Sequence, residues 1–442
     1  MINYGYKNKK LRIAKIEVEK LFGVYDYTLD CFSNKTEDNL IILYGDNGTG
    51  KSTILHLISF LLSNKRRNGH KSQMANIEFK SFKLTFDTGD FILAYRKKQP
   101  SGFMGSFNIR YKINNISDDF FLKAQRDDGE EWVIRCWADD SDEQFEKLMR
   151  ILDETKILYI SDYRKGLDEE DEQIPYDEFK NGYSRIRISR DKKEEEVESE
   201  IRKLKEWIIG RALAASKKGE EGTSDIYVKI LQQLIYNQEY TSSVDSIAKL
   251  KLELLNLSRM ANPYVKMGFL SDSDFNGLMS NLDKIGADKK ELVNAILAPY
   301  IEMLSNKLTA LNDLMRILSF LIDSLSEYFH EKIINFTVND GFVIRHSKNG
   351  SVIAPHSLSS GEKQLLILFS KIIRRSSESS FIIIDEPEIS LNIKWQRMLM
   401  DTLSFFVGES HAQFIIATHS FEILSRHMDN VVKLEDINHE LY

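Results

Sequence analysis

The strongest chemical signal in the sequence is a glycine-rich loop between two apolar segments. Residues 45–52 read GDNGTGKS and fit the pattern G-x-x-x-x-G-K-[ST]. The apolar run 41–44 before it suits a buried strand, and the amphipathic run 54–62 after it suits a helix. Glycines allow a backbone to wrap closely around a phosphate, with its N–H groups turned inward. The sequence therefore predicts a phosphate-binding loop.

Two side chains in this loop have chemistry that glycine cannot supply. In this pattern the ammonium of Lys51 reaches the β- and γ-phosphates, and the hydroxyl of Ser52 is a ligand for Mg²⁺. The helix that starts here adds the partial positive charge of its N-terminus. We therefore expect ATP and Mg²⁺ as the bound groups.

A second loop with anion-binding character lies far along the chain. Residues 358–364 read LSSGEKQ and lead directly into the apolar run LLILFSKII. Two serine hydroxyls and the free N–H groups of a helix start would meet there. Such a helix start is often only a cap, but the segment that follows it favours a role in binding an anion.

That next segment places acidic residues at the end of a buried strand. Four apolar residues precede Asp385 and Glu386, as expected for a parallel strand covered on both faces. Ligands bind at the carboxyl ends of such strands. Asp385 can hold Mg²⁺, and Glu386 is placed to orient or deprotonate a water. A further buried strand, 413–417, ends at His419, which can contact a γ-phosphate or the water.

The elements that must position these residues can be read from the periodicity of the chain. Alternating apolar and polar residues predict strands, with a hairpin at Gly89-Asp90. The expected strands are 11–24, 27–32, 77–86, 91–95, 107–113, 156–160 and 333–345, and the expected helices include 141–152, 194–213 and 394–405.

The middle of the chain differs in composition and reads almost entirely as helices. We expect one helical insertion from Gly166 to about Phe329, with breaks near Asn262-Pro263, Gly277, Gly286 and Pro299. Its last part, 297–329, is the best candidate for a helix pair or arm. Sustained heptads with regular flanking charges are missing, which argues against a long coiled coil.

The bulk composition limits the class of protein. The chain has 442 residues, 42% hydrophobic and 29% charged, and a net charge of −7. The whole chain is therefore not an electrostatic binder of nucleic acid, although local basic patches remain possible. Two cysteines indicate a reducing compartment. No signal peptide or apolar run of membrane-spanning length is apparent, so we expect a cytoplasmic protein without a membrane partner.

The four motifs, in this order, resemble the ATP-binding cassette superfamily. They are the phosphate loop, the signature LSSGEKQ, the Walker B segment FIIIDEP and the switch THS. The segment DEPEISLNIKWQ and the long chain between Lys51 and Leu358 resemble the SMC/RecF/OLD branch rather than transporters. The resemblance covers 11–164 and 333–434, and it leaves the helical middle unmatched.

The resemblance implies a fold and a division of the chain. The fold class is α/β, an ABC ATPase head with a mixed sheet, an antiparallel β subdomain and an inserted helical domain. The expected domains are 1–165 and 331–442, the two halves of the head, and 166–330, the helical insertion.

The resemblance also implies a shared site between two copies arranged head to tail. The catalytic residues would be Glu386 and His419, and Ser52 and Asp385 would hold Mg²⁺. The signature of the second copy would contact the γ-phosphate. The residues expected to bind nucleotide are Asn47, Gly48, Thr49, Gly50, Lys51, Ser52 and Thr53 in one copy, with Ser359, Ser360 and Gly361 from the other.

The sequence departs from the superfamily pattern in two places. The signature has Ser360 and Glu362 where the usual motif has glycine and glutamine. The glutamine expected at a strand end before the insertion is missing after the strand 156–160. Asp162 acting through water, or Gln125, are the alternatives, and the position stays unassigned.

Within this branch, the chain resembles stand-alone ATPase subunits of bacterial anti-phage systems, such as Septu, PARIS and retron-associated ATPases. The short stretch after Ser420 is not expected to hold an OLD-type nuclease. The resemblance implies a slow ATPase that assembles or gates a separate effector, such as a nuclease. The alternative is a RecF-like repair ATPase that binds DNA. Three basic clusters, 65–67, 96–98 and 185–193, discriminate only weakly between these two functions.

Overall fold

A computed structural model of the chain describes residues 11–31, 39–64, 69–97, 102–126, 131–134, 141–153, 155–161, 190–220, 245–271, 290–424 and 426–436. These residues form two compact units. One unit combines Met1–Ile186 with Arg375–Tyr442, and the other is Arg187–Arg374. The three-part domain division expected from the sequence stays a proposal. Each unit is described by itself below.

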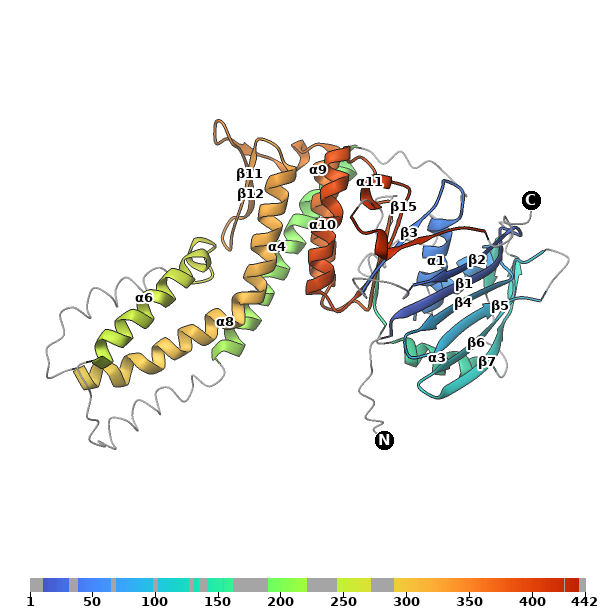
Figure 1. The fold of residues 1–442 in the computed structure, drawn as a ribbon, viewed down its shortest axis with the longest axis horizontal. Coiled ribbons are helices and arrows are strands. Elements are labelled where there is room, and N and C mark those ends of the chain that lie inside the picture. The colour runs from blue at the N-terminus through green and yellow to red at the C-terminus, as the bar shows by residue number, and fades with distance from the viewer. Residues whose placement is uncertain are drawn as a thin grey trace. The chain divides into compact units, whose positions relative to one another are not determined.

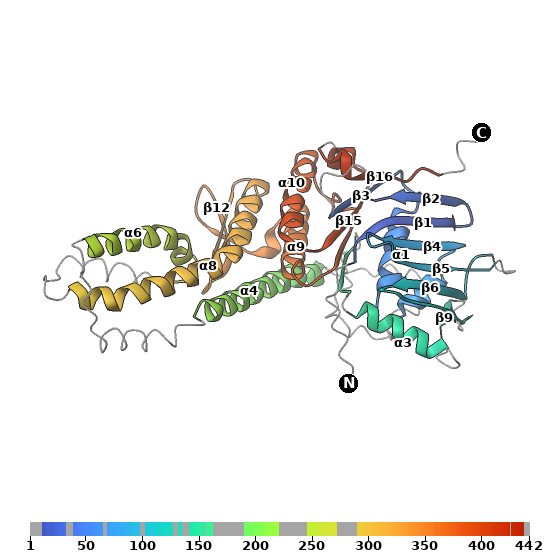
Figure 2. The same ribbon diagram turned by 60° about the horizontal axis from the view of Figure 1, so that its bottom comes forward.

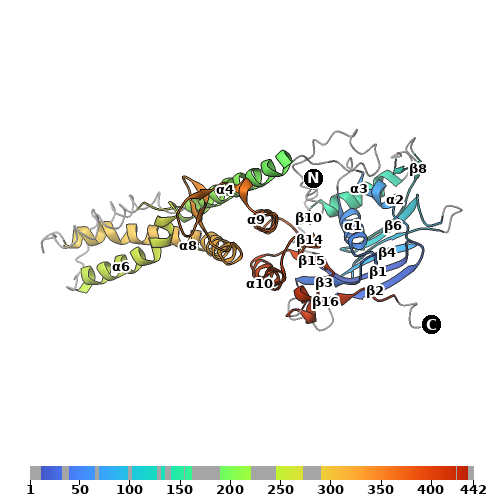
Figure 3. The ribbon, with the colours of Figure 1, turned by 90° about the horizontal axis from the view of Figure 1, so that it is seen from above.

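The centre of the first unit is a five-stranded sheet in which every pairing is parallel. The strand order is β10-β14-β15-β3-β16, as seen from above in Figure 3. Continuous burial of β14 and β15 explains their unbroken apolar sequences. The strands are β3 (Leu40–Tyr44), β10 (Ile157–Ile160), β14 (Phe381–Asp385), β15 (Gln413–Thr418) and β16 (Val431–Lys433).

The second sheet of this unit is antiparallel, with the order β2-β1-β4-β5-β6-β7, and its strands lie side by side in Figure 2. Along β4, Phe82, Leu84 and Phe86 are buried while the alternate residues face outward. The strands are β1 (Ile13–Leu21), β2 (Tyr25–Asp30), β4 (Ser81–Phe86), β5 (Phe91–Tyr95), β6 (Phe107–Ile113) and β7 (Ile116–Leu122), with β8 (Ala124–Arg126) and β9 (Trp132–Ile134) forming a small separate sheet.

Helix α1 (Lys51–Leu62) joins the two sheets through one hydrophobic core, which also receives α3 (Ser141–Leu152). Its fully buried residues include Ile54 and Leu61, each contributing about 1.5–3 kcal/mol of burial free energy. Gln413, at the start of β15, reaches the other sheet, because its side chain accepts from Ile13 N and donates to Ile13 O. The phosphate loop therefore begins a helix that is held on two sides.

The C-terminal end of α1 is capped by a buried lysine from α2 (His70–Ala75). Lys71 Nζ donates to Phe60 O at 2.5 Å and Leu61 O at 2.7 Å, satisfying carbonyls that the helix leaves without intrahelical partners. Burial lowers the pKa of Lys71 to about 7. These contacts fix the axis of the helix whose other end starts at the glycine loop.

One residue of the basic clusters, Arg96, is part of the core and not of a basic surface. It is 5% exposed, stacks on Phe79 at 4.0 Å, and donates to Ile77 O, Phe103 O and Met74 O at 2.5–2.8 Å. Burial lowers its pKa to about 9. The interpretation of 96–98 as a possible DNA-binding patch is therefore wrong for Arg96. Residues 65–67 and 185–189 lie outside the described residues.

The second unit contains the long helices α4 (Arg190–Glu220), α6 (Asp245–Lys266) and α8 (Lys290–Tyr328). Figure 1 shows α6 alongside α8. The unit also contains β11 (Lys332–Thr337), β12 (Gly341–His346), β13 (Val352–Ile353), the 3-10 helix η3 (Pro355–Ser357) and α9 (Ser360–Arg375), whose last residue opens the other unit. Among the described residues, no helix combines the length and apolar character needed to cross a bilayer.

The expected break at Pro299 is wrong, because α8 runs through this proline. Helix α6 passes Pro263 and ends soon after it, at Lys266, and Gly277 and Gly286 lie outside the described residues. A proline removes one helical hydrogen bond, and the packing of these helices outweighs that loss. The sequence reading also missed an apolar seam along α8, spaced alternately by four and three residues. Its buried members are Leu297, Ile301, Leu304, Leu308, Leu311, Met315 and Leu318.

Candidate functional site

Three neighbouring parallel strands bring the predicted residues of the first unit to one edge. Asp385 of β14 pairs with Ala417 of β15, and Thr418 pairs with Tyr44 of β3. The carboxyl ends of these strands therefore stop at the same level. The residues that follow them are Glu386, His419 and the loop that begins at Gly45.

The glycine loop has the conformation that its sequence predicts. Gly48 and Gly50 have φ values of 85° and 88°, a region that side chains disfavour. A Cβ on Gly50 would lie 2.7 Å from Leu21 Cδ2, so glycine is required there for space as well. The exposed stretch 46–48 leaves Asn47 and Gly48 accessible, with Thr49 half-buried beside them.

Lys51 is held inside the loop by backbone carbonyls of the same loop. Its ammonium donates to Gly45 O at 2.7 Å and Asp46 O at 2.9 Å, and the residue is only 4% exposed. Ser52 and Thr53 follow in the first turn of α1 and are half-buried. This arrangement puts a cation, N–H groups and a hydroxyl at one helix start, as phosphate binding requires.

The sequence reading missed a tyrosine that supports this loop from the antiparallel sheet. Tyr27 OH donates to Thr49 O at 2.9 Å. Burial and the neighbouring Tyr25 raise the pKa of Tyr27 to about 12, so it stays a donor at neutral pH. No motif marks this contact, since it joins a strand of the antiparallel sheet to the glycine loop after β3.

The two acidic residues after β14 differ in their surroundings. Asp385 is 7% exposed, and Tyr159 of β10 has its pKa raised by burial and then by the charge of Asp385. Glu386 is half-buried and has a φ of 48°, which is uncommon for this residue type. Its N–H donates to Ala417 O at 2.9 Å, and this bond holds the strained backbone. Strain of this kind concentrates at functional sites.

His419, the expected switch residue, faces Glu386. Its Nδ1 lies 3.3 Å from Glu386 Oε1, and its side chain is 43% exposed. A second carboxylate, Glu388, lies 3.5 Å from the same nitrogen. Glu388 also accepts from Thr418 Oγ1 at 2.5 Å and from His419 N at 3.1 Å. The sequence reading assigned Glu388 no role, and only its place in the turn after Glu386 could have marked it.

The turn containing His419 is also tied to helix α10 (Ile393–Glu409). Ser420 Oγ donates to Gln396 Oε1 at 2.7 Å, and Gln396 Nε2 donates to Leu391 O at 3.0 Å. Ser420 N donates to Thr418 Oγ1 at 3.0 Å. The ends of β14 and β15 and the start of α10 are therefore one hydrogen-bonded assembly.

The signature lies in the second unit, where it forms the start of helix α9. Ser359 N donates to Glu362 Oε2 at 2.8 Å, and Glu362 N donates back to Ser359 Oγ at 3.4 Å. This reciprocal pair is a capping box. Ser359 and Ser360 are exposed, whereas Gly361 is buried. The helix therefore presents two serines and its open N-terminus to solvent.

Glu362 explains one departure from the usual signature. Lys332 Nζ pairs with both of its carboxylate oxygens, at 2.5 and 2.7 Å. Burial alone would raise the pKa of Glu362, but the hydrogen bonds from Lys332 and Ser359 outweigh it and lower the pKa. A glutamine would cap the helix at this position but could not form the ion pair.

The donor set in the first unit suits a magnesium ion that arrives with a nucleotide. Among the described residues, no cluster of three or more His, Cys, Asp and Glu could hold a metal by itself. Ser52 and Asp385 offer a hydroxyl and one carboxylate, and Mg²⁺ is commonly bound by one or two carboxylates together with substrate phosphates.

Of the residues considered for the missing glutamine, Gln125 lies on β8 in the two-stranded sheet, and Asp162 lies outside the described residues.

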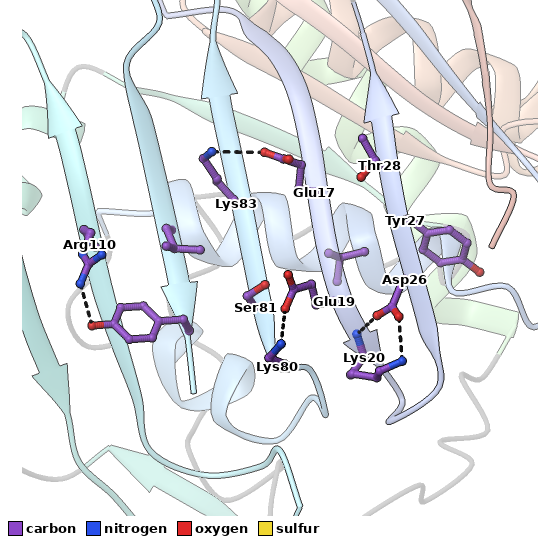
Figure 4. A pocket seen from close by; sticks show the side chains of 13 residues that line it. Glu17, Glu19, Lys20, Asp26, Tyr27, Thr28, Lys80, Ser81, Lys83 and Arg110 are labelled. Carbon is purple, nitrogen blue, oxygen red and sulfur yellow. Dashed lines mark hydrogen bonds and ion pairs between the residues drawn. The ribbon is translucent and has the colours of Figure 1, made fainter. Parts of the chain in front are cut away.

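The outer face of the antiparallel sheet carries a separate open hollow, shown in Figure 4. Its charged side chains pair with one another across strands. Lys83 meets Glu17 at 3.3 Å, Lys80 meets Glu19 at 2.8 Å and Lys20 meets Asp26 at 2.7 Å. These pairs neutralise one another, and Arg110, which also lines the hollow, pairs with Asp119 at 2.7 Å.

Comparison with known proteins agrees with these features. The chain is 26% identical to the retron Vc95 probable ATPase of Vibrio cholerae serotype O1 biovar El Tor, over 97% of this chain and 74% of that protein. This agrees with the expected resemblance to retron-associated ATPases.

Solved structures of Smc heads also align with the chain, but only weakly. The Smc head domain of Pyrococcus furiosus with an extended coiled coil, bound to the C-terminal domain of ScpA, matches with a TM-score of 0.36 and 15% identity, covering 96% of this chain and 95% of that chain. The Smc head of Pyrococcus yayanosii matches with a TM-score of 0.35 and 13% identity, covering 97% and 98%.

The family assignment comes from a match that spans nearly the whole described chain. The AAA ATPase domain family, AAA_15, matches residues 13–424. This range contains the glycine loop, the signature, the β14 acidic pair and His419. The chain therefore belongs to the AAA ATPase domain family.

Proposed function

We propose that this protein binds ATP with Mg²⁺ between two copies, hydrolyses it slowly, and uses the cycle to assemble or gate a separate effector. The observation that carries the proposal is the common edge of β3, β14 and β15. There the phosphate loop, the acidic pair and His419 meet at the ends of adjacent strands.

In one copy, the residues around the loop provide phosphate binding. Lys51 exchanges its bonds to Gly45 O and Asp46 O for the β- and γ-phosphates. The backbone from Asn47 to Thr53 surrounds the phosphates, and the start of α1 adds its dipole. Ser52 and Asp385 hold Mg²⁺, which supplies charge neutralisation for the phosphates when bound.

Two further residues act on the water. Glu386, which directly follows the end of β14, orients and deprotonates the attacking water. His419 donates a hydrogen bond to the γ-phosphate or to the same water. Its proximity to Glu386, with 3.3 Å between Nδ1 and Oε1, supports a joint role for the pair.

The second copy completes the site through its signature. The exposed Ser359 and Ser360 and the N–H groups at the start of α9 suit contact with a γ-phosphate. Ser359 Oγ accepts from Glu362 N in the capping box and keeps its own proton to donate, so the hydroxyls of both Ser359 and Ser360 are assigned to phosphate. ATP then joins two copies, and hydrolysis separates them.

Gating of an effector is supported by the similarity to a retron-associated probable ATPase. The long helices α4, α6 and α8 offer an extended surface for such a partner. The partner class we propose is a nuclease or toxin encoded beside this chain, acting in antiviral defence in the cytoplasm.

The direct test is an ATPase assay on the purified chain with and without DNA, at several salt concentrations. We expect slow hydrolysis that DNA does not stimulate, loss of hydrolysis in Lys51→Ala, and copurification with the product of a neighbouring gene. Hydrolysis that depends on DNA, with an affinity that falls steeply with salt, would favour the RecF-like alternative.

A further inference from the structure

The turn after β14 contains a carboxylate that the proposed ATP chemistry does not use. Glu388 is 3% exposed. Its Oε1 accepts from Thr418 Oγ1 and His419 N, while Oε2 is buried without a hydrogen-bond partner among the described residues. A buried carboxylate with an unsatisfied oxygen lowers stability. An apolar side chain would pack here at less cost, so the acid needs a reason other than packing.

That reason is found in the surroundings of His419. Its Nδ1 lies between two acceptors, 3.3 Å from Glu386 Oε1 and 3.5 Å from Glu388 Oε1. With both carboxylates at Nδ1, the nitrogen left to meet a phosphate oxygen or water is Nε2. Nδ1 is within hydrogen-bond range of Glu386 Oε1 in the structure, and a bond to Glu386 alone would occupy the carboxylate that must act on water. Glu388 provides the alternative acceptor.

We propose that Glu388 is a positioning residue for His419. Its buried carboxylate fixes the backbone of His419 through the N–H, accepts Nδ1–H, and so leaves Glu386 free for the attacking water. Thr418 holds the carboxylate in place through its hydroxyl. Glu388 itself contacts neither nucleotide nor water. This inference rests on the proposed hydrolysis of ATP at this edge.

A double-mutant cycle separates this role from a merely structural one. We expect Glu388→Gln to lower kcat by about 10- to 100-fold, the loss typical of a hydrogen bond to a charged group, with an unchanged Kd for ATP. In a His419→Ala background the same change should lower kcat no further, because both residues act through one contact. An equal loss in both backgrounds would overturn the proposal.

A second pair of variants keeps the test decisive if Glu388→Gln unfolds the protein. Thr418→Val removes the hydroxyl that bonds Glu388, and Thr418→Ser retains it. We expect the valine variant to lose kcat without losing ATP affinity, and the serine variant to recover it. Wild-type kcat in a folded Thr418→Val variant would overturn the role of Glu388.

The control is Glu422→Gln, the same change on a neighbouring glutamate of α11 (Phe421–Leu424) that pairs with Arg397 at 2.6 Å. It should leave kcat unchanged. A wild-type chain without ATPase activity dependent on Lys51 would overturn the proposed function and this role together. An active wild type with unaltered kcat in Glu388→Gln would overturn only the role of Glu388.

Discussion

Replacing Glu362 by alanine should loosen the start of α9 and with it the signature. The carboxylate accepts from Ser359 N and pairs with Lys332 Nζ at 2.5 Å, and the two charged side chains are only 6% and 20% exposed. Loss of the hydrogen bond from Ser359 N costs about 1 kcal/mol, and loss of the charged hydrogen bond from Lys332 costs about 2 kcal/mol more. The sum corresponds to about a 100-fold rise in the local opening equilibrium.

Hydrogen–deuterium exchange of a peptide covering 358–366 measures this opening directly. Glu362→Gln is the matched control, since it keeps an acceptor for Ser359 N but loses the charge, and its effect should be intermediate. Lys332→Met should have little further effect in the Glu362→Ala background, because the pair is already broken. Exchange as slow as in the wild type in Glu362→Ala would refute the assigned packing.

The same contact predicts a dependence on pH. The pKa of Glu362 lies below the ordinary value of a glutamate, because the hydrogen bonds from Lys332 and Ser359 outweigh burial. A carboxyl with a lowered pKa adds stability that is complete above its unfolded pKa and is lost as the pH falls through the folded pKa. The difference between wild type and Glu362→Ala should therefore be constant near neutral pH and shrink in acid. A difference that grows in acid would contradict this assignment.

Three further predictions concern the first unit. Lys51→Ala should weaken ATP binding by about 100-fold through loss of charged hydrogen bonds, and unchanged affinity by calorimetry would contradict the phosphate-loop assignment. Gly50→Ala should lower stability by about 1–3 kcal/mol, because its φ is 88° and Leu21 blocks the added Cβ; an unaltered melting temperature would exclude this strain. Arg96→Met should cost about 3 kcal/mol, because several buried carbonyls lose their donor, and urea unfolding with a wild-type midpoint would show that these bonds contribute little.

The motifs could be predicted from sequence because local chemistry specifies them. The glycine loop needs positive φ values, and β14 needs an unbroken apolar run to be buried on both faces. Each requirement is met by residues that are consecutive in the sequence. The strand and helix on either side of Lys51 follow for the same reason.

The parts that sequence reasoning missed depend on contacts between distant segments. The seam along α8 has heptad spacing in the sequence, but it lacks the regular flanking charges that mark a coiled coil, and the prolines at 263 and 299 are accommodated by packing rather than by local preference. Arg96 looked like part of a basic surface, but carbonyls from several turns enclose it. Strands β7, β8 and β9 lie in a stretch whose charges and aromatic residues concealed their alternation.

The support around His419 was hidden for a related reason. Glu388, Thr418 and Gln396 come from three different elements and meet only after β14, β15 and α10 assemble. The resemblance to a known superfamily pointed to Glu386 and His419. The resemblance gave no indication that the carboxylate of Glu388 also lies near His419.

The measurement that tests the shared ATP site most directly is native mass spectrometry of mixed copies, made in a Glu386→Gln background to prevent hydrolysis. One copy carries Lys51→Ala and the other Ser360→Arg. Neither variant alone should form an ATP-bound dimer, because every site contains a defect. Mixed together, they should form a dimer holding one ATP, between the intact loop of one copy and the intact signature of the other. An ATP-bound dimer formed by the Ser360→Arg chain alone, or no dimer on mixing, would contradict the account.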